Sequence, residues 1–452
     1  MLDMRPLRRR SRPESPLTTS RVVRLLAAGA LTAASPFGTP SAHAVSPPQI
    51  DDRWLPKPAL PAPPLPTVQR EVCAVAAANS PPGRNQLADL DLPHVWQLTR
   101  GAGQRVAVID TGVSRHPRLP DVVAGGDYVS TGDGTQDCDE HGTLVAGIIA
   151  ATTDSKADNF SGVAPEVTLI SIRQSSAKFA PASNPSSAGV GDVDTMARAV
   201  RTAADLGASV INISSVACVA VGSALDDRAL GAALAYAVDI KNAVIVAAAG
   251  NTGGAAQCPQ QPPDATWATA TVAVSPAWYD DYVLTVGSVN AQGAPSAFTL
   301  AGPWVDVAAA GEAVTSLGSA PISGTSYAAP VVSGLAALIR ARFPALTARQ
   351  VMQRIESTAH HPPAGWDPLV GHGTVDALAA VSTDSAPPTG TSAPAPASVA
   401  ITTPAAPTPP DPHARNTAFG GAAICLVALL AALGTGAARG RSRRSRDRIP
   451  GD

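Results

Sequence analysis

The chain has 452 residues, of which 45 % are hydrophobic, 4 % aromatic and 15 % charged. This length accommodates one large domain or two modest ones with accessory segments, and any core must be built mainly from Ala, Val, Leu and Ile. The formal net charge is −2. That balance argues against a nucleic-acid-binding protein, which would carry a basic excess.

The charge is distributed unevenly. Residues 1–44 contain seven arginines and two acids, for a net charge of +5, and residues 439–452 contain six arginines and two acids, for +4. Residues 45–438 therefore carry −11. The 43 prolines are also clustered, so a uniformly globular cytosolic protein is not expected.

The amino terminus has the pattern of a secretory signal peptide. A basic stretch ending at Arg24 is followed by an apolar run at 25–34, and an A-x-A sequence ends at Ala44. This order predicts export and cleavage after Ala44. An amphipathic core helix would need polar residues with a period of 3.6, and that pattern is absent. Residues 1–44 are therefore assigned to a signal peptide.

The carboxyl terminus has the pattern of a membrane anchor. Residues 418–438 contain no charge over 21 positions, and six arginines follow within 439–452. Such a run can cross a hydrocarbon core about 30 Å thick. The positive-inside rule then predicts a cytoplasmic basic tail at 439–452. We expect a single-pass protein of the cell membrane whose preceding region lies outside the cytoplasm; a buried soluble helix would rarely have such flanks.

Two proline-rich stretches frame the central region. Residues 45–70 contain eight prolines and residues 383–416 contain nine. Both predict extended polyproline-type segments without helix or interior strand. We assign 383–417 to a stalk and 45–86 to an arm that wraps the domain, because a free linker would not explain its apolar side chains, namely Trp54, Leu55, Leu60 and Leu65.

Residues 87–382 alternate short apolar runs with helical patterns, which predicts one α/β domain with a mostly parallel sheet covered by helices on both faces. In such sheets, ligands bind at the carboxyl ends of the strands. Residues 175–194, rich in Ser, Pro, Ala and Gly, are expected to form a long exposed loop. The apolar runs are 105–110, 167–172, 208–213, 243–248 and 282–286, and the main helical stretches are 195–206 and 225–240.

Four cysteines lie in the region predicted to be exported, and Cys425 lies in the predicted membrane span. An even number in an oxidising compartment predicts two disulfides, for which three connectivities are possible. The pairing that we favour would tie the arm to the domain. A metal site is the alternative, but no C-x-x-C pair supports it. The favoured pairs are Cys73–Cys138 and Cys218–Cys258.

Three segments place an acid, a base and a nucleophile at the ends of predicted elements. Asp110 ends a strand in the sequence VIDTGV, His141 begins a small-residue helix with HGTLVAG, and Ser326 lies in SGTSYAAP. Hydrolysis of an amide needs a nucleophile, a base that takes its proton and an acid that orients the base. Pro330 is expected in the first turn of the helix that begins at Ser326, where its missing N–H costs nothing.

A fourth element is Asn251, which follows the strand at 243–249. Its amide at the end of a strand can donate to a developing oxyanion. Each motif alone has a simpler interpretation: Asp110 could belong to half of an aspartic-protease motif, His141 could be an ordinary helix-terminal histidine, and Gly250-Asn251 could be a turn. Together, in the order Asp, His, Asn, Ser, they favour a catalytic site.

These segments resemble the subtilisin-like serine proteases, or subtilases, over residues 90–381. The sequences SGVAP at 161–165 and GHGTVDA at 371–377 match the family as well. The resemblance implies a subtilisin-like fold and serine endopeptidase activity. It also implies a catalytic triad, an oxyanion donor and a strand edge that pairs with the substrate backbone, formed respectively by Asp110, His141 and Ser326, by Asn251, and by Ser214, Ser215 and Val216.

The accessory segments resemble those of the mycosins, the membrane-anchored proteases of type VII secretion systems. This resemblance implies protein or peptide substrates and a type VII secretion membrane complex as partner. Two alternatives stay open: a structural component with dispensable peptidase activity, and a general surface protease. No cofactor is expected, and no metal either, because no convincing acidic loop for calcium is present.

Overall fold

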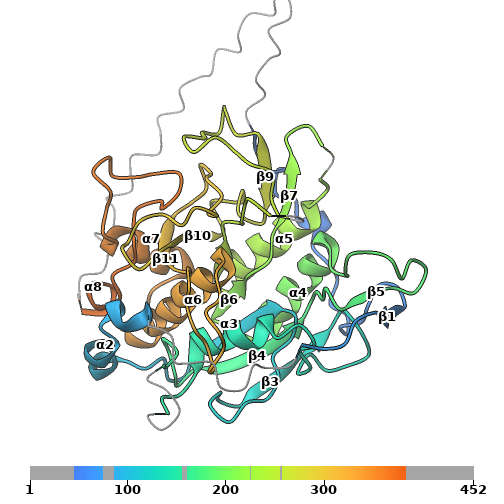
Figure 1. Ribbon diagram of the computed structural model, residues 1–452, viewed down its shortest axis with the longest axis horizontal. Helices are drawn as coiled ribbons and strands as arrows, with labels where there is room; N and C mark the ends of the chain where they lie inside the picture. Colours follow the sequence, from blue (N-terminus) through green and yellow to red (C-terminus); the bar gives the residue numbers. More distant parts are fainter. Residues whose placement is uncertain (1–44, 75–85, 155–159, 224, 255–256, 383–452) are drawn as a thin grey trace, which may run out of the picture. The chain divides into compact units, whose positions relative to one another are not determined.

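The computed structural model describes residues 45–74, 86–154, 160–223, 225–254 and 257–382 (Figure 1). The predicted signal peptide, stalk, transmembrane helix and basic tail lie outside these residues. Within the described ranges, no helix combines the length and apolar character needed to cross a membrane.

The centre of the domain is a sheet of seven strands, each parallel to its neighbours. The prediction of an α/β domain with a parallel sheet is confirmed. Five strands correspond to the predicted apolar runs, whereas β3 and β11 at the two edges were not predicted. In spatial order the strands are β11 (Val307–Ala310), β10 (Leu284–Val289), β8 (Val244–Ala248), β6 (Val210–Ile213), β2 (Arg105–Asp110), β4 (Thr168–Arg173) and β3 (Val122–Asp127).

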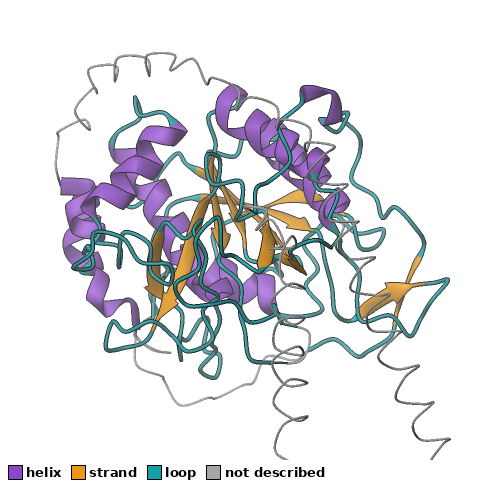
Figure 2. Cartoon of the chain, turned by 90° about the horizontal axis from the view of Figure 1, so that it is seen from above, coloured by secondary structure: helices purple, strands orange, loops and turns teal. Residues whose placement is uncertain are grey.

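Helices lie on both sides of the strands (Figure 2). The long helix α6 (Thr325–Arg342) packs against β2, β6, β8, β10 and β11, and it also contacts α3 (His141–Ala150). Helix α4 (Val193–Asp205) packs against β2, β4 and β6 together with its neighbour α5 (Arg228–Ala235), which continues into the π-helical turn η3 (Tyr236–Ile240). The remaining helices are η1 (Asp52–Trp54), η2 (Gln86–Leu90), α2 (Leu92–Leu98), α7 (Ala348–Thr358) and α8 (Ala377–Ser382).

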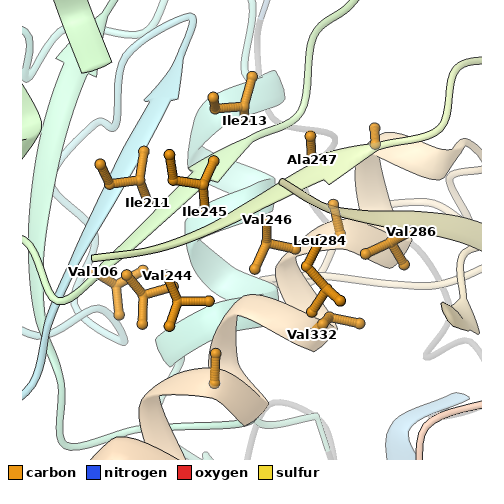
Figure 3. Packing of buried hydrophobic residues seen from close by; sticks show 14 of the residues in the cluster. Val106, Ile211, Ile213, Val244, Ile245, Val246, Ala247, Leu284, Val286 and Val332 are labelled. Atoms are coloured by element: carbon orange, nitrogen blue, oxygen red, sulfur yellow. The ribbon is translucent and has the colours of Figure 1, made fainter. Parts of the chain in front are cut away.

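The core is made of aliphatic side chains from alternating strand positions. In Figure 3, Val244 and Val246 of β8 point toward α6, where Val332 lies beside Leu284, whereas Ile245 points to the opposite side. All five are at most 1 % exposed. Because both faces of the sheet are covered, the strands are buried at nearly every position and carry apolar side chains on both faces, with a few buried polar residues such as Asn212 among them.

The first described residues run along the surface of the domain. The Val45 backbone N–H donates to the Trp267 carbonyl at 2.8 Å, and the Arg228 guanidinium lies 3.9 Å from the centre of the Trp54 ring. Further along, β1 (Thr67–Gln69) pairs in antiparallel fashion with β5 (Phe179–Pro181).

The pairing of β1 with β5 corrects part of the expectation of a long exposed loop at 175–194, since most of this segment is irregular but three of its residues form a strand. This segment contains β5, and its end includes Asp192, whose carboxylate caps α4 by accepting from the Thr195 N–H at 2.7 Å. A strand of three residues has no amphipathic pattern of its own, since its partner lies more than a hundred residues away. The local composition therefore predicted only a loop.

Both disulfides join segments that are distant in sequence. Cys73 is bonded to Cys138 and Cys218 to Cys258. Cys218 lies in β7 (Ala217–Ala220), which forms a second two-stranded sheet with β9 (Val272–Ser275). The cysteines are therefore structural, and the metal-site interpretation of these four is wrong.

A pair of glycine substitutions tests the contact of the arm. At Gly126 (φ +116°) an added Cβ would lie 2.2 Å from Pro61 Cγ, whereas at Gly103 (φ +80°) nothing lies within 4 Å. Both Gly126→Ala and Gly103→Ala should cost about 1–3 kcal/mol of unfolding free energy through positive φ, measured by chemical denaturation. Only Gly126→Ala should also expose the arm to limited proteolysis, with cleavage sites located by mass spectrometry. Equal protease sensitivity of the two variants would contradict the contact.

Candidate active site

Asp110 and His141 are joined by a short hydrogen bond. Asp110 is the last residue of β2 and only 2 % exposed, and its Oδ1 lies 2.7 Å from His141 Nδ1. The same oxygen accepts from the Thr111 N–H at 2.7 Å. A carboxylate only accepts, so Nδ1 carries the proton and Nε2 is left as the free ring nitrogen of a neutral imidazole.

The surroundings of His141 favour its protonated form. Its side chain is 28 % exposed. Burial lowers the pKa of His141, but the charge and hydrogen bond of Asp110 raise it, and the charges of Asp137 and Asp139 add to this effect. The net result is a pKa above the ordinary value of 6.5. A positive charge that arrives on this ring is therefore stabilised where it forms.

Asp137 holds the segment that carries His141. Its carboxylate accepts from the N–H and the hydroxyl of Thr143, at 2.8 and 2.7 Å, and from the Thr111 hydroxyl at 2.8 Å. It also accepts from the Glu140 N–H at 2.9 Å. Glu140 occupies the N-cap position of α3 but makes no capping hydrogen bond, so Asp137 satisfies the free N–H groups instead. Burial raises the pKa of Asp137, although the bonds from Thr143 and Thr111 oppose this.

Sequence reasoning missed Asp137. Its signal was its position four residues before His141, at a predicted helix start where aspartate is a favoured cap. The nearby Asp139 and Glu140 offered the same signal, and local sequence does not distinguish among the three.

Ser326 is the second residue of α6. Its hydroxyl donates to the Ser214 carbonyl at 2.8 Å, and the Ser214 hydroxyl donates to the Ser326 carbonyl at 2.9 Å. The expectation that Pro330 lies in the first helical turn is wrong, because α6 begins at Thr325 and Pro330 is its sixth residue. An interior proline removes the N–H that would bond the carbonyl four residues earlier, which here is that of Ser326. The Ser214 hydroxyl replaces this donor.

A buried polar chain supports Ser214 in turn. The Ser333 hydroxyl donates to Asn212 Oδ1 at 2.8 Å, and Asn212 Nδ2 donates to the Ser214 hydroxyl at 2.9 Å. Ser333 and Asn212 are completely buried. The side chains of Ser333, Asn212 and Ser214 thus all have hydrogen-bond partners, as a low-dielectric interior requires. This series of hydrogen bonds connects the middle of α6, through the end of β6, to the backbone of Ser326.

Asn251 lies on the other side of the amino-terminal end of α6. Its Oδ1 accepts from the N–H and the hydroxyl of Thr325, at 2.9 and 3.0 Å. The amide nitrogen is thereby turned toward Gly324, where an added Cβ would lie 3.5 Å from Asn251 Nδ2. Thr325 therefore orients the donor, a role that sequence analysis did not assign.

The structure brings the predicted site residues to one edge of the sheet. Tyr327, the neighbour of Ser326, places its ring 5.2 Å from the His141 imidazole, so the first turn of α6 lies against His141. Ser215 and Val216 line a hollow of about 120 Å³. The first turn of α3 also borders a hollow of about 430 Å³, whose lining includes apolar residues such as Leu317 and Ile322 and charged ones such as Arg115 and Glu140.

No cofactor-binding arrangement is evident at this edge. Among the residues that the structure describes, no group of three or more His, Cys, Asp or Glu side chains is placed to hold a metal ion.

The comparisons with known proteins agree on one family. The Subtilase family profile (Peptidase_S8) matches residues 101–373. The chain is 73 % identical to Mycosin-4 of Mycobacterium tuberculosis (strain ATCC 25618 / H37Rv), over 96 % of this chain and 100 % of that protein.

Solved structures give the same result. The MycP3 protease from the type VII (ESX-3) secretion system is 45 % identical with a TM-score of 0.69, over 75 % of this chain and 100 % of that one. A chain of the intact ESX-5 inner membrane complex is 41 % identical with a TM-score of 0.69, over 87 % of this chain and 100 % of that one.

The electrostatic origin of the His141 pKa can be tested directly. Asp110→Asn removes the nearest negative charge but leaves the ring partly buried, so the His141 pKa should fall relative to the unaltered chain. The measurement is a pH titration of ¹⁵N-labelled histidines by NMR. His116, whose pKa burial and Arg118 already lower, is the internal control and should not move. An unchanged His141 pKa would contradict the assigned cause.

Proposed function

Because this chain belongs to the subtilase family of serine proteases and, within it, to the mycosins, we propose that it cleaves protein or peptide substrates with Asp110, His141 and Ser326 as catalytic residues. The observation that carries the proposal is the 2.7 Å hydrogen bond between Asp110 and His141, beside the helix end that bears Ser326. Acid, base and hydroxyl each come from a different element, yet they meet at one edge of the sheet.

In this proposal His141 takes the proton of Ser326 while the hydroxyl oxygen attacks a peptide carbonyl. In the free protein that hydroxyl proton is donated to the Ser214 carbonyl, so the Ser326 side chain must rotate toward Nε2 before attack. Asp110 keeps the proton on Nδ1 and stabilises the imidazolium that forms. His141 then protonates the leaving amine, and water resolves the acyl-enzyme by the same steps in reverse.

The oxyanion is assigned to two donors. Asn251 Nδ2 is one, since Thr325 occupies the oxygen side of its amide. The Ser326 backbone N–H is the other, because N–H groups in the first turn of a helix have no acceptor within the helix. Preorganised donors of this kind stabilise the charge that develops in the transition state without reorganisation.

The substrate backbone is placed along Ser214, Ser215 and Val216, just before β7. The hollow beside Ser215 and Val216 would receive a side chain on the acyl side of the scissile bond. The leaving group would lie on the side of His141, since His141 must deliver a proton to it.

We assign the protein to the outer face of the cell membrane, anchored by the segment at 418–438 with a cytoplasmic tail at 439–452. Its proposed partner is the type VII secretion membrane complex. This assignment is supported by the export and anchor patterns of the sequence and by the likeness to a chain of the ESX-5 inner membrane complex.

A second role follows from the same likeness. The arm is attached to the domain by β1, by a disulfide and by the Trp54–Arg228 contact, none of which cleavage itself requires. The alternative function is a structural component of the secretion complex whose peptidase activity is dispensable. A general surface protease without a secretion partner would not co-purify with large membrane complexes.

The nucleophile can be identified by covalent labelling. A fluorophosphonate probe should label the full chain at one serine, and Ser326→Ala should abolish the labelling, because Ser326 is the hydroxyl that His141 is proposed to activate. Ser357→Ala, which removes a hydroxyl that donates to the Arg354 carbonyl within α7 at 3.1 Å, is the control and should keep the label. A labelled peptide containing another serine would refute the assignment of Ser326.

Complementation separates the enzymatic role from the structural one. In a strain that lacks this protein, Ser326→Ala should restore assembly of the secretion complex, assayed by native electrophoresis of solubilised membranes, but not processing of secreted proteins. If the Ser326→Ala protein restores both assembly and processing, the structural role is the required function. If it restores neither, catalysis is needed for assembly.

A further inference from the structure

Tyr327 is placed to act on His141 although no step of the proposed mechanism uses it. It follows Ser326 in the first turn of α6, and its N–H donates to the Gly324 carbonyl at 3.0 Å. Successive residues of a helix point about 100° apart. The Ser326 hydroxyl and the Tyr327 ring therefore leave the helix in different directions: the hydroxyl donates to the Ser214 carbonyl, and the ring lies against His141.

The contact between Tyr327 and His141 is between rings. Their centroids are 5.2 Å apart with planes inclined by 45°. Asp110 fixes the Nδ1 corner of the imidazole, but one hydrogen bond still allows the ring to rock about the line that joins the two atoms. A second, bulky contact away from Nδ1 limits this rocking, and Tyr327 supplies it.

The surroundings of Tyr327 favour the neutral form of its phenol. Burial, followed by the negative charges of Asp110 and Asp137, raises the pKa of its phenol to about 12. The ring therefore adds no charge near His141 at neutral pH. What it contributes is shape and exclusion of water.

Water at this position would weaken the electrostatics of the site. The charged groups that act on His141 are Asp110 at the end of β2 and Asp137 and Asp139 in the segment before α3, and the group that faces it from α6 is Tyr327. Charges interact more strongly where water is excluded. The half-buried Tyr327 ring covers one side of the His141 imidazole and excludes water from that side.

We propose that Tyr327 is a positioning residue that holds the His141 imidazole in line with Asp110 and shields this pair from water. The proposal rests on the proposed function, since it assigns Tyr327 a part in the proton transfers of His141. It predicts that the reactivity of Ser326 depends on the aromatic ring of Tyr327 and not on its hydroxyl.

The experiment compares Tyr327→Phe, Tyr327→Leu and Tyr327→Met in the full chain by the kinetics of fluorophosphonate labelling. Tyr327→Phe keeps the ring and should label Ser326 at the rate of the unaltered chain. The Leu and Met variants should lower the maximal labelling rate by roughly tenfold to a hundredfold through misplacement of His141, with little change in the probe concentration for half-maximal rate. Two aliphatic variants are used so that a folding defect in one does not remove the test.

The pH dependence distinguishes positioning from a merely structural role. Removal of the ring admits water beside His141. This water reduces the desolvation that lowers the His141 pKa, and it also screens the acidic residues, whose combined effect on the pKa is larger and upward. The pKa should then move down toward 6.5, and the acidic limb of the labelling rate should move to lower pH. Tyr282→Leu, which removes a half-buried tyrosine packed under Arg349, is the control and should leave the limb in place.

An aliphatic variant with the labelling rate and pH profile of the unaltered chain would overturn the proposal, as would a Tyr327→Phe variant as slow as Tyr327→Leu. These outcomes can be distinguished from a failure of the proposed function. That function fails if Ser326→Ala is still labelled, whatever the Tyr327 variants do.

Discussion

The parallel direction of all seven strands is the constraint on which the rest of the structure depends. Carboxyl ends of parallel strands meet at one edge of a sheet. β2 ends at Asp110, the segment after β6 carries Ser214, and the segment after β8 carries Asn251. The strand topology thus brings residues separated by up to 141 positions along the chain to the same edge. Helix α6 completes the site because its amino-terminal end, with Ser326, lies at that edge as well.

The two disulfides reinforce the segments that hold the site. Cys138 lies three residues before His141, and its partner Cys73 belongs to the segment that includes β1. Cys258 donates its N–H to the Asn251 carbonyl at 2.9 Å. Its partner Cys218 follows Val216 closely, in β7. Each covalent bond therefore limits the motion of a segment next to a proposed catalytic or oxyanion group, in a domain that relies on aliphatic side chains for its core.

Helix α6 shows how the fold accommodates a local cost. Pro330 removes one backbone hydrogen bond, and a buried carbonyl left without a donor would destabilise the domain by about 1–3 kcal/mol. The Ser214 hydroxyl satisfies that carbonyl, and Asn212 and Ser333 satisfy Ser214. Small residues allow the close packing: at Gly334 an added Cβ would lie 2.6 Å from Val163 Cβ. The position of Ser326 is thereby set by buried contacts along α6.

The sequence by itself determined the α/β class, five of the seven central strands, and the candidates Asp110, His141, Asn251 and Ser326. These features depend on short-range patterns, namely apolar runs and residue types at the ends of elements. Only the tertiary structure decided that Asp137 caps α3, that Thr325 turns the Asn251 amide, that Ser214 bonds the carbonyl freed by Pro330, and that β1 pairs with β5. The last three are contacts between residues more than seventy positions apart, of which local sequence carries no record, whereas for the cap the local sequence offered Asp137, Asp139 and Glu140 equally and only the fold selected Asp137.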